Sequence, residues 1–319
     1  MPSVTAPCKL PSQRPIALAV CACLSLLLCG NAMAQEAEAL SSQDEPPAED
    51  VPAGASGKLL LTGGVTQVEG AAGGGLTPWA VIGGYGTRDQ IGGNAFYTRV
   101  KVSDYTLDSY GALVGIRDRV ELSVSRQAFD TEAVGAALGL GRGFVIRQDT
   151  YGVKLKLAGD AVLEQDRWMP QVAVGVQHKR NNQGALLSAI GAKSDSGTDV
   201  YVSATKLYLG TGLLLNATLR LTKANQFGIL GFGGDKHDGY KPQLEGSAAY
   251  LINRNLAIGA EYRSKPDNLN IAREQNAWDA FIAWAPAKRV SLTVAYVDLG
   301  NIVIRDNQRG WYASLQVGF

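Results

Sequence analysis

The feature that most constrains the fold is an alternation of apolar and polar residues with period two, from residue 58 to the end of the chain. It is clearest in the last segment, where every second residue is apolar: Trp311, Ala313, Leu315, Val317 and Phe319. This period is typical of strands with one apolar and one polar face. No stretch of this region approaches 18 consecutive apolar residues, so we expect no helical membrane spans there.

We predict about 14 strands, an even number as in single-chain bacterial barrels. Twelve is also possible, because the first two or three segments are glycine-rich and weakly patterned. The predicted spans are 58–67, 75–86, 94–103, 107–116, 119–128, 147–158, 168–179, 198–208, 211–222, 242–251, 256–265, 276–285, 289–298 and 310–319. Their connections alternate between short and long in the second half, which places the C-terminus on the periplasmic side.

These strands predict an all-β fold, a transmembrane antiparallel up-and-down β-barrel in the bacterial outer membrane. An unpaired backbone group in hydrocarbon costs several kcal/mol, so a span built of strands must close on itself. The tryptophans fit, since rings collect at the two lipid–water boundaries. The predicted aromatic girdle is Trp79, Trp168, Trp278, Trp284 and Trp311. The alternative is a secreted β-sandwich with core tryptophans.

The chain divides into three predicted parts. Residues 1–34 have a basic start at Lys9 and Arg14, an apolar run and small residues before Gln35, which is the pattern of a cleaved signal peptide. An uncleaved anchor or a lipoprotein start at Cys29 are the alternatives. Residues 35–57 hold six acids and three prolines, so we expect a flexible acidic leader. Residues 58–319 form the barrel.

Composition excludes several classes of function. All four cysteines lie in residues 1–34, so cleavage would leave no disulfide or thiolate site. Loss of Lys9 and Arg14 would leave 28 of the 30 basic residues against all 29 acids, a balance that argues against nucleic-acid binding. We expect a monomer, because no trimer contact is evident in the sequence.

Strand parity predicts a polar lumen. The inward-facing candidates for lining a pore are the bases Arg99, Lys101, Lys154, Lys156, Arg220 and Arg263, with the acids Glu121, Glu245, Glu261 and Asp279. Rings of Arg and Lys favour anions. A fully salt-bridged, closed interior is the alternative.

No catalytic set is evident, so we expect no enzyme, no cofactor and no metal. The two histidines are His178, near the outer end of a strand, and His237, in a polar loop with Asp235 and Asp238. His237 and its acids would activate a water or hold a divalent cation only if they came together. The glycine clusters 139–143 and 228–234 lack the strand–loop–helix context of a phosphate loop.

The segments Gly57–Gly64, Gly73–Ala80, Gly84–Gln90 and Tyr296–Val303 resemble an uncharacterised proteobacterial outer-membrane family known only as domain of unknown function 3034. The resemblance covers essentially the whole chain after the leader and implies no activity. The C-terminal strand also resembles the signal read by the barrel-assembly machinery, matched here by Leu315, Val317 and Phe319. That resemblance implies transient contacts with this machinery and with periplasmic chaperones, besides outer-membrane lipids and lipopolysaccharide.

Three functions follow as hypotheses. The first is a passive channel for small polar or anionic solutes. The second is a closed structural or surface-interaction barrel, with a transporter of hydrophobic molecules as a variant of the channel. The third is a membrane hydrolase using His178 or His237. The leader, with its six acids, would either enter the lumen from the periplasmic side as a gate or serve as a disordered tether.

Overall fold

The structure is a computed structural model that describes residues 57–271 and 273–319, and its main element is a closed barrel of twelve antiparallel strands. The wall strands are β3 (Ile91–Val102), β4 (Thr106–Ile116), β5 (Val120–Asp130), β6 (Val145–Ala158), β7 (Gln171–Asn181), β8 (Ser196–Tyr208), β9 (Leu213–Thr222), β10 (Lys241–Asn253), β11 (Leu256–Arg263), β12 (Ala277–Ala287), β13 (Val290–Asp298) and β14 (Arg309–Gly318). Each wall strand pairs with its neighbours in sequence, and β14 pairs with β3 to close the barrel.

The remaining elements are short. A two-residue pair, β1 (Val65–Thr66) and β2 (Ala72–Gly73), forms a separate small sheet. The helices are α2 (Glu132–Ala137), α3 (Gly184–Ala189) and the 3-10 turn η2 (Asn225–Gly228). Within the described residues, no helix has the length and apolar content needed to cross a membrane.

The sequence alternation becomes an inside and an outside of the wall. On β9, for example, Leu215, Leu219 and Leu221 are exposed, while Asn216, Thr218 and Arg220 are buried. The last residue adds backbone hydrogen bonds where the barrel closes. The Phe319 carbonyl accepts hydrogen bonds from the backbone amides of Tyr85 and Gly93.

The outer face carries an apolar belt. Leucine, isoleucine, valine, tyrosine and tryptophan side chains that are about two-fifths to two-thirds exposed occur on every strand of the wall. Each such side chain gains about 1.5–3 kcal/mol on leaving water. A closed barrel with this belt and a polar interior is stable with lipid around it, so the protein belongs to the bacterial outer membrane.

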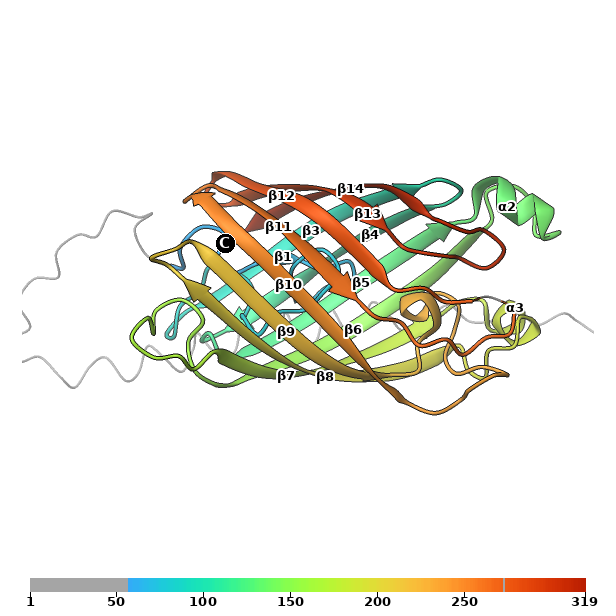
Figure 1. Cartoon of the computed structure of the whole chain (residues 1–319), viewed down its shortest axis with the longest axis horizontal. Coiled ribbons are helices and arrows are strands. Elements are labelled where there is room, and N and C mark those ends of the chain that lie inside the picture. The colour runs from blue at the N-terminus through green and yellow to red at the C-terminus, as the bar shows by residue number, and fades with distance from the viewer. Residues whose placement is uncertain (1–56, 272) are drawn as a thin grey trace, which may run out of the picture. The chain divides into compact units, whose positions relative to one another are not determined.

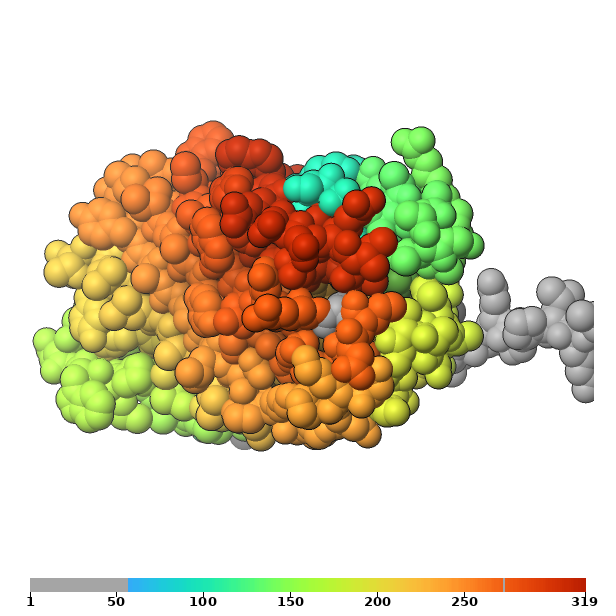
Figure 2. All heavy atoms as spheres, turned by 45° about the vertical axis from the view of Figure 1, so that its right-hand side comes forward, coloured from blue at the N-terminus to red at the C-terminus, as the bar shows by residue number. Residues whose placement is uncertain are grey.

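The two ends of the barrel differ. The connections β4–β5, β8–β9, β10–β11 and β12–β13 are short and share one end with the C-terminus. The opposite end carries the long loops with α2, α3 and η2 (Figure 1). Figure 2 shows the loops with α2 (green) and α3 (yellow-green) beside the orange and red loops of the last strands at that end. Short periplasmic turns and long outer loops are the pattern of outer-membrane barrels, so we call these the periplasmic and outer ends.

The predicted count of 14 strands is wrong, and the count of twelve that the weak first segments left possible is confirmed. The segments predicted as strands 58–67 and 75–86 do not enter the wall. They belong to residues 57–86, which fold inside the barrel around the β1–β2 pair and which we call the plug (Figure 1). The predicted signal peptide and nearly all of the acidic leader lie outside the described residues.

The aromatic girdle needs one correction. Trp278, Trp284 and Trp311 are exposed on wall strands, and Trp168 lies exposed in the periplasmic β6–β7 connection. Trp79 is instead buried in the plug, where its indole N–H donates to the Ser247 hydroxyl over 2.9 Å. A ring with a polar end fits a lumen as well as a lipid boundary, so parity alone could not place it.

Candidate functional site in the plugged lumen

The plug occupies the lumen. Every residue from Val65 to Ile82 is buried, because the wall surrounds this segment on all sides. Glycine makes this close approach possible: a Cβ added at Gly74 would collide with the carboxylate of Glu261. Side chains at such positions would push the plug away from the wall.

One carboxylate of the plug meets a cluster of buried wall charges. Glu69 pairs with Lys179 of β7 and Arg263 of β11, the latter at 2.9 Å, and lies 3.9 Å from Arg220 of β9. Two wall acids complete the cluster, since Asp199 pairs with Lys179 at 2.7 Å and Glu245 with Arg220 at 2.5 Å. We call this set of three bases and three acids the latch cluster: Glu69, Lys179, Asp199, Arg220, Glu245 and Arg263.

The latch cluster keeps Glu69 ionised. Glu69 lies in the plug and not in a membrane-spanning strand. Burial raises the pKa of its carboxyl, but the charges of Arg263, Lys179 and Arg220 outweigh that and hold the pKa below its ordinary range. A buried charge with this many partners is costly to unpair.

A second anchor holds the plug where its chain doubles back. Glu121 of β5 accepts hydrogen bonds from the backbone amides of Ala72 and Gly83, at 3.0 and 2.8 Å. Lys154 of β6 pairs with Glu121 and donates to the carbonyls of Ala72 and Val81, at 2.9 Å each. This ion pair therefore fixes two separate points of the plug backbone.

A third set of bonds holds the tip around Pro78. Glu261 of β11 accepts from the Leu76 amide at 2.7 Å and from the Thr77 hydroxyl at 2.6 Å. The Pro78 carbonyl faces three polar wall side chains of β8 and β9: Ser203, Asn216 and Thr218. All three anchors are polar, and beside them the plug side chains Val68, Leu76 and Trp79 share a buried apolar cluster with the wall.

The bonds from the plug are distributed unevenly around the wall. Hydrogen bonds reach β3 to β11, and at the periplasmic side Thr66 bonds to Asn94 of β3 and Gln316 of β14. Among the residues that the structure describes, none joins the plug to β12 or β13. Hydrogen bonds therefore anchor the plug around most of the wall, on β3 to β11 and on β14.

The structure places eight of the ten predicted lumen residues in the interior. Lys154, Lys156, Arg220, Arg263, Glu121, Glu245, Glu261 and Asp279 are buried. Most of them contact the plug or each other and do not border an open pore. Lys156 instead pairs with Asp118 and Asp160 near the periplasmic end.

Arg99 and Lys101 were predicted on the wrong face. Both are exposed on the outside of β3, where Arg99 lies 3.7 Å from Asp108 and Lys101 pairs with Glu132 of α2 at 2.5 Å. The inward residues of this stretch are the apolar Val100 and Val102. The rule that apolar residues face lipid fails here, because the outer part of the lumen is itself apolar.

Sequence reasoning missed half of the latch cluster. Lys179 shares the inward parity of Gln171 and Gln177 on β7, and Asp199 shares that of Ser203 and Thr205 on β8, so parity could have identified both. Glu69 gave no such signal, because it lies between two segments predicted as wall strands.

The histidines stand apart from each other and from the lumen. His178 is exposed on the outer face of β7, and its Nδ1 lies 3.0 Å from the Thr198 hydroxyl. His237 is in the exposed loop before β10, where Asp235 bonds to Asn270 and Asp238 to Lys223. Among the described residues, no three His, Cys, Asp or Glu side chains come together as metal ligands.

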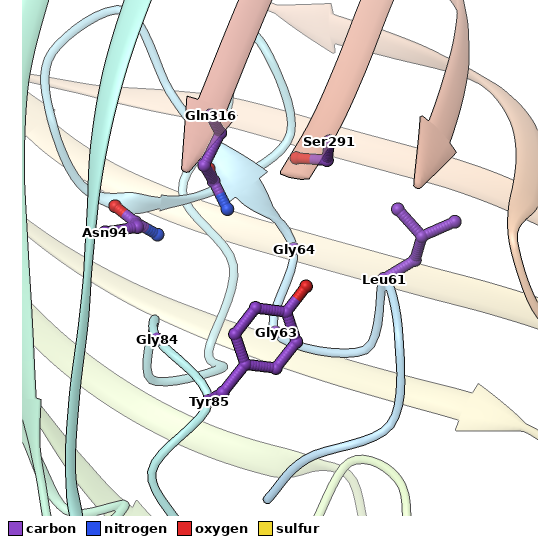
Figure 3. Close-up of a pocket in the computed structure, with 8 residues that line it drawn as sticks. All are labelled: Leu61, Gly63, Gly64, Gly84, Tyr85, Asn94, Ser291 and Gln316. Carbon is purple, nitrogen blue, oxygen red and sulfur yellow. The ribbon is translucent and has the colours of Figure 1, made fainter. Parts of the chain in front are cut away.

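Two of the spaces between the plug and the wall lie at opposite ends of the barrel. The first lies at the periplasmic end, where Leu61, Gly63 and Gly64 of the plug face Asn94, Ser291 and Gln316 of β3, β13 and β14 (Figure 3). Tyr85 projects toward the middle of this space in the same view. The space is lined by both polar and apolar side chains.

The second space, which we call the outer cavity, lies at the outer end. Its floor is Val68 and Leu76 of the plug, its wall includes Val100 and Val297, and its roof includes Phe227 of η2. Its volume is about 30 Å³, and twelve of its thirteen lining residues are apolar or aromatic, with Gln226 the exception.

The roof is held in a strained backbone. Gln226 and Phe227 both have left-handed φ angles, 47° and 61°, which side-chain-bearing residues rarely adopt. Side chains from the wall and loops hold them there. The Arg263 guanidinium lies 4.2 Å from the centre of the Phe227 ring. The Lys265 ammonium group donates to the side-chain oxygen Oε1 of Gln226 at 2.5 Å.

Solved structures similar to this chain are outer-membrane barrels. They include the KdgM porin, with a TM-score of 0.45 and 10% identity, covering 71% of this chain and 99% of the porin. The NanC porin has a TM-score of 0.42 and 11% identity, covering 72% and 98%. Outer membrane phospholipase A from Escherichia coli has a TM-score of 0.40 and 10% identity, covering 74% and 94%. A search of the curated proteins found no match.

A family model matches most of the chain, from residue 62 to residue 316. The matched region includes most of the plug as well as the wall, so both parts fall within what defines the family. The chain belongs to the family described as protein of unknown function (DUF3034).

Proposed function

We propose that this protein is a gated outer-membrane channel, in which the plug closes the lumen and its displacement opens a passage for small solutes. The observation that carries the proposal is that a segment outside the wall fills the lumen and is anchored to it by hydrogen bonds and ion pairs at several points. Water can replace hydrogen bonds of this kind, which contribute about 0.5–1.5 kcal/mol net between neutral groups and about 1.5–3 kcal/mol when one group is charged. The plug also shares a buried apolar cluster with the wall, through Val68, Leu76 and Trp79, so its displacement exposes apolar surface and the closed state is favoured.

The latch cluster suggests the selectivity of the open state. When the plug is in place, the three bases of the latch cluster face the three acids of the same cluster. When Glu69 leaves, Lys179, Arg220 and Arg263 remain with only Asp199 and Glu245. The excess of one positive charge at this level would favour small anions over cations, as basic rings do in other pores.

Deleting residues 57–86 tests the proposal in planar bilayers. The deletion variant should give steady conductance with a reversal potential shifted toward that of the anion, while the full chain should stay mostly closed with brief openings. Equal and steady conductance of both proteins would contradict gating by the plug. A full chain that never opens under any voltage would favour the second candidate, a closed structural barrel, which the dense bonding of the plug also supports.

A further inference from the structure

We infer that the latch cluster is a binding site for the carboxylate of a small organic anion, and that Glu69 occupies this site as a tethered ligand while the plug is in place. The inference deepens the proposed function and rests on it, because it names monocarboxylates as the class of solute that the open lumen binds. Three observations support it: the hydrogen bonds to the Glu69 carboxylate, the contacts that position the bases, and the charge that the plug supplies.

The carboxylate of Glu69 is held as a bound ligand would be. The two ends of the Arg263 guanidinium donate to its two oxygens, Nη1 to Oε2 at 2.9 Å and Nη2 to Oε1 at 3.2 Å. Lys179 donates to Oε1 from a second strand, and the Gln67 side chain of the plug donates to Oε2 at 2.9 Å. A guanidinium fork on two oxygens matches the planar carboxylate group. The site therefore selects a carboxylate and not merely a negative charge.

The wall positions the three bases through contacts of its own. Arg220 donates to Glu245 at 2.5 Å, and Lys179 donates to Asp199 at 2.7 Å. Arg263 lies 3.3 Å from the same Glu245 carboxylate. None of these contacts involves the plug, so the bases keep their places when Glu69 leaves. A site that is already ordered binds its ligand at a smaller cost in conformational freedom.

The charge of the latch cluster sets the charge of the ligand. With Glu69 the cluster holds three bases and three acids, and the five members on the wall are at most 4% exposed. Without Glu69 the two wall acids leave one positive charge uncompensated, which is costly in a buried place. One monovalent anion restores the balance, and a carboxylate does so with the hydrogen bonds that Glu69 accepts.

Binding at this site is coupled to the position of the plug. A ligand shifts an equilibrium only when it binds one of the two states better than the other. Glu69 fills the site in the closed state, so a free carboxylate binds the state in which Glu69 has left. A carboxylate solute would thus favour the displacement of the plug that lets it pass.

The test uses Glu69→Ala in the full chain, with acetate and acetamide as a matched pair of probes at pH 7. Alanine keeps Cβ, and acetate replaces the atoms that the substitution removes, from Cγ to the two oxygens. Acetamide has the same shape without the charge. Glu69→Ala should bind acetate saturably and acetamide at least about tenfold more weakly, the ratio expected for hydrogen bonds to a charged group. Wild type should bind neither probe saturably, because Glu69 fills the site.

Binding is followed by carbon-13 NMR with carboxyl-labelled acetate and carbonyl-labelled acetamide in detergent, with empty micelles subtracted. Glu132→Ala is the matched control, because it removes one acid from the exposed outer surface and leaves the latch cluster intact. It should behave like wild type. Adding Arg263→Met to Glu69→Ala removes the guanidinium fork and should abolish the preference for acetate. Lys179→Met in the same background serves if the first double variant does not fold.

Three results would overturn the inference: no saturable binding of acetate by Glu69→Ala, equal affinity for acetate and acetamide, or the same binding by Glu132→Ala. These results would show that the latch cluster only ties the plug to the wall. Binding is measured without conductance, so a Glu69→Ala protein that binds acetate but never opens in bilayers would overturn only the gating proposal.

Discussion

At the scale of single residues, closure of the lumen depends on groups that pair across it. Glu69 is fully buried and faces three basic side chains from three different strands. Its partners on the wall are themselves partly neutralised by Asp199 and Glu245. Removing the charge of Glu69 therefore leaves the wall cluster with an excess positive charge while the plug is still in place.

We predict that Glu69→Gln opens the channel. Breaking a buried ion pair by removing one partner costs about 3 kcal/mol, which is roughly a 100-fold change in the ratio of open to closed states. Open probability in planar bilayers should rise accordingly. Glu132→Gln, which removes an exposed ion pair with Lys101 on the outer surface, should change it little. Equal open probability for both variants would show that the latch cluster does not hold the plug.

At the scale of elements, the outer loops are joined by exposed polar contacts. Lys236 pairs with Asp267, and Asp235 accepts from the backbone and side chain of Asn270. The amides of Lys236 and His237 donate to the Asn268 carbonyl, at 3.0 and 3.3 Å. These contacts dock the loop before β10 onto the loop before β12.

This docking should depend on pH. Hydrogen bonds from Asn270 lower the pKa of Asp235. Partial burial raises the pKa of Asp267, but the hydrogen bond and charge of Lys236 outweigh burial, so the pKa of Asp267 is lowered as well. An aspartate whose pKa is lowered in the folded form stabilises that form fully when the pH is above the ordinary aspartate pKa of 3.8. This stabilisation is lost as the pH falls through the lowered pKa. We therefore expect docking to persist from pH 7 to 5 and to weaken below about pH 4.

Hydrogen exchange at the Lys236 and His237 amides, corrected for intrinsic rates, measures the docking. Protection should fall below pH 4 in wild type and should already be reduced at pH 7 in Lys236→Met, which keeps the length of the side chain but removes its charge. Protection that stays constant from pH 7 to 3 would contradict this account of the loops.

Most wall strands could be predicted from the sequence, because each faces lipid on one side and polar groups on the other. The segments 58–67 and 75–86 could not be assigned, since a chain surrounded by the wall is buried whatever its pattern. An even strand number allowed both 12 and 14. Arg99 and Lys101 were misplaced because the lumen behind β3 is apolar, which reverses the usual inference from parity.

At the scale of the whole molecule, the barrel and the plug have different physical roles. The wall is stabilised by a closed backbone ladder and by lipid around its apolar belt. The plug is held to that wall by hydrogen bonds, ion pairs and a shared apolar cluster, and it is continuous with the wall only through residues 87–90 before β3. The same molecule can therefore keep its barrel intact while the plug changes position.

A reversible cross-link between plug and wall tests this central claim most directly. The hydroxyls of Thr77 and Ser247 lie 2.5 Å apart, close to the roughly 2.0 Å of a disulfide, and residues 57–319 contain no native cysteine. The control pair joins two wall strands, Thr98 and Ser314, whose hydroxyls are 2.8 Å apart.

The measurement is single-channel conductance of the Thr77→Cys/Ser247→Cys protein before and after reduction, beside Thr98→Cys/Ser314→Cys. We predict that the oxidised plug-to-wall protein does not open, that reduction restores openings, and that the wall-to-wall protein opens in both states. Openings of the oxidised plug-to-wall protein at the same rate as after reduction would contradict gating by the plug.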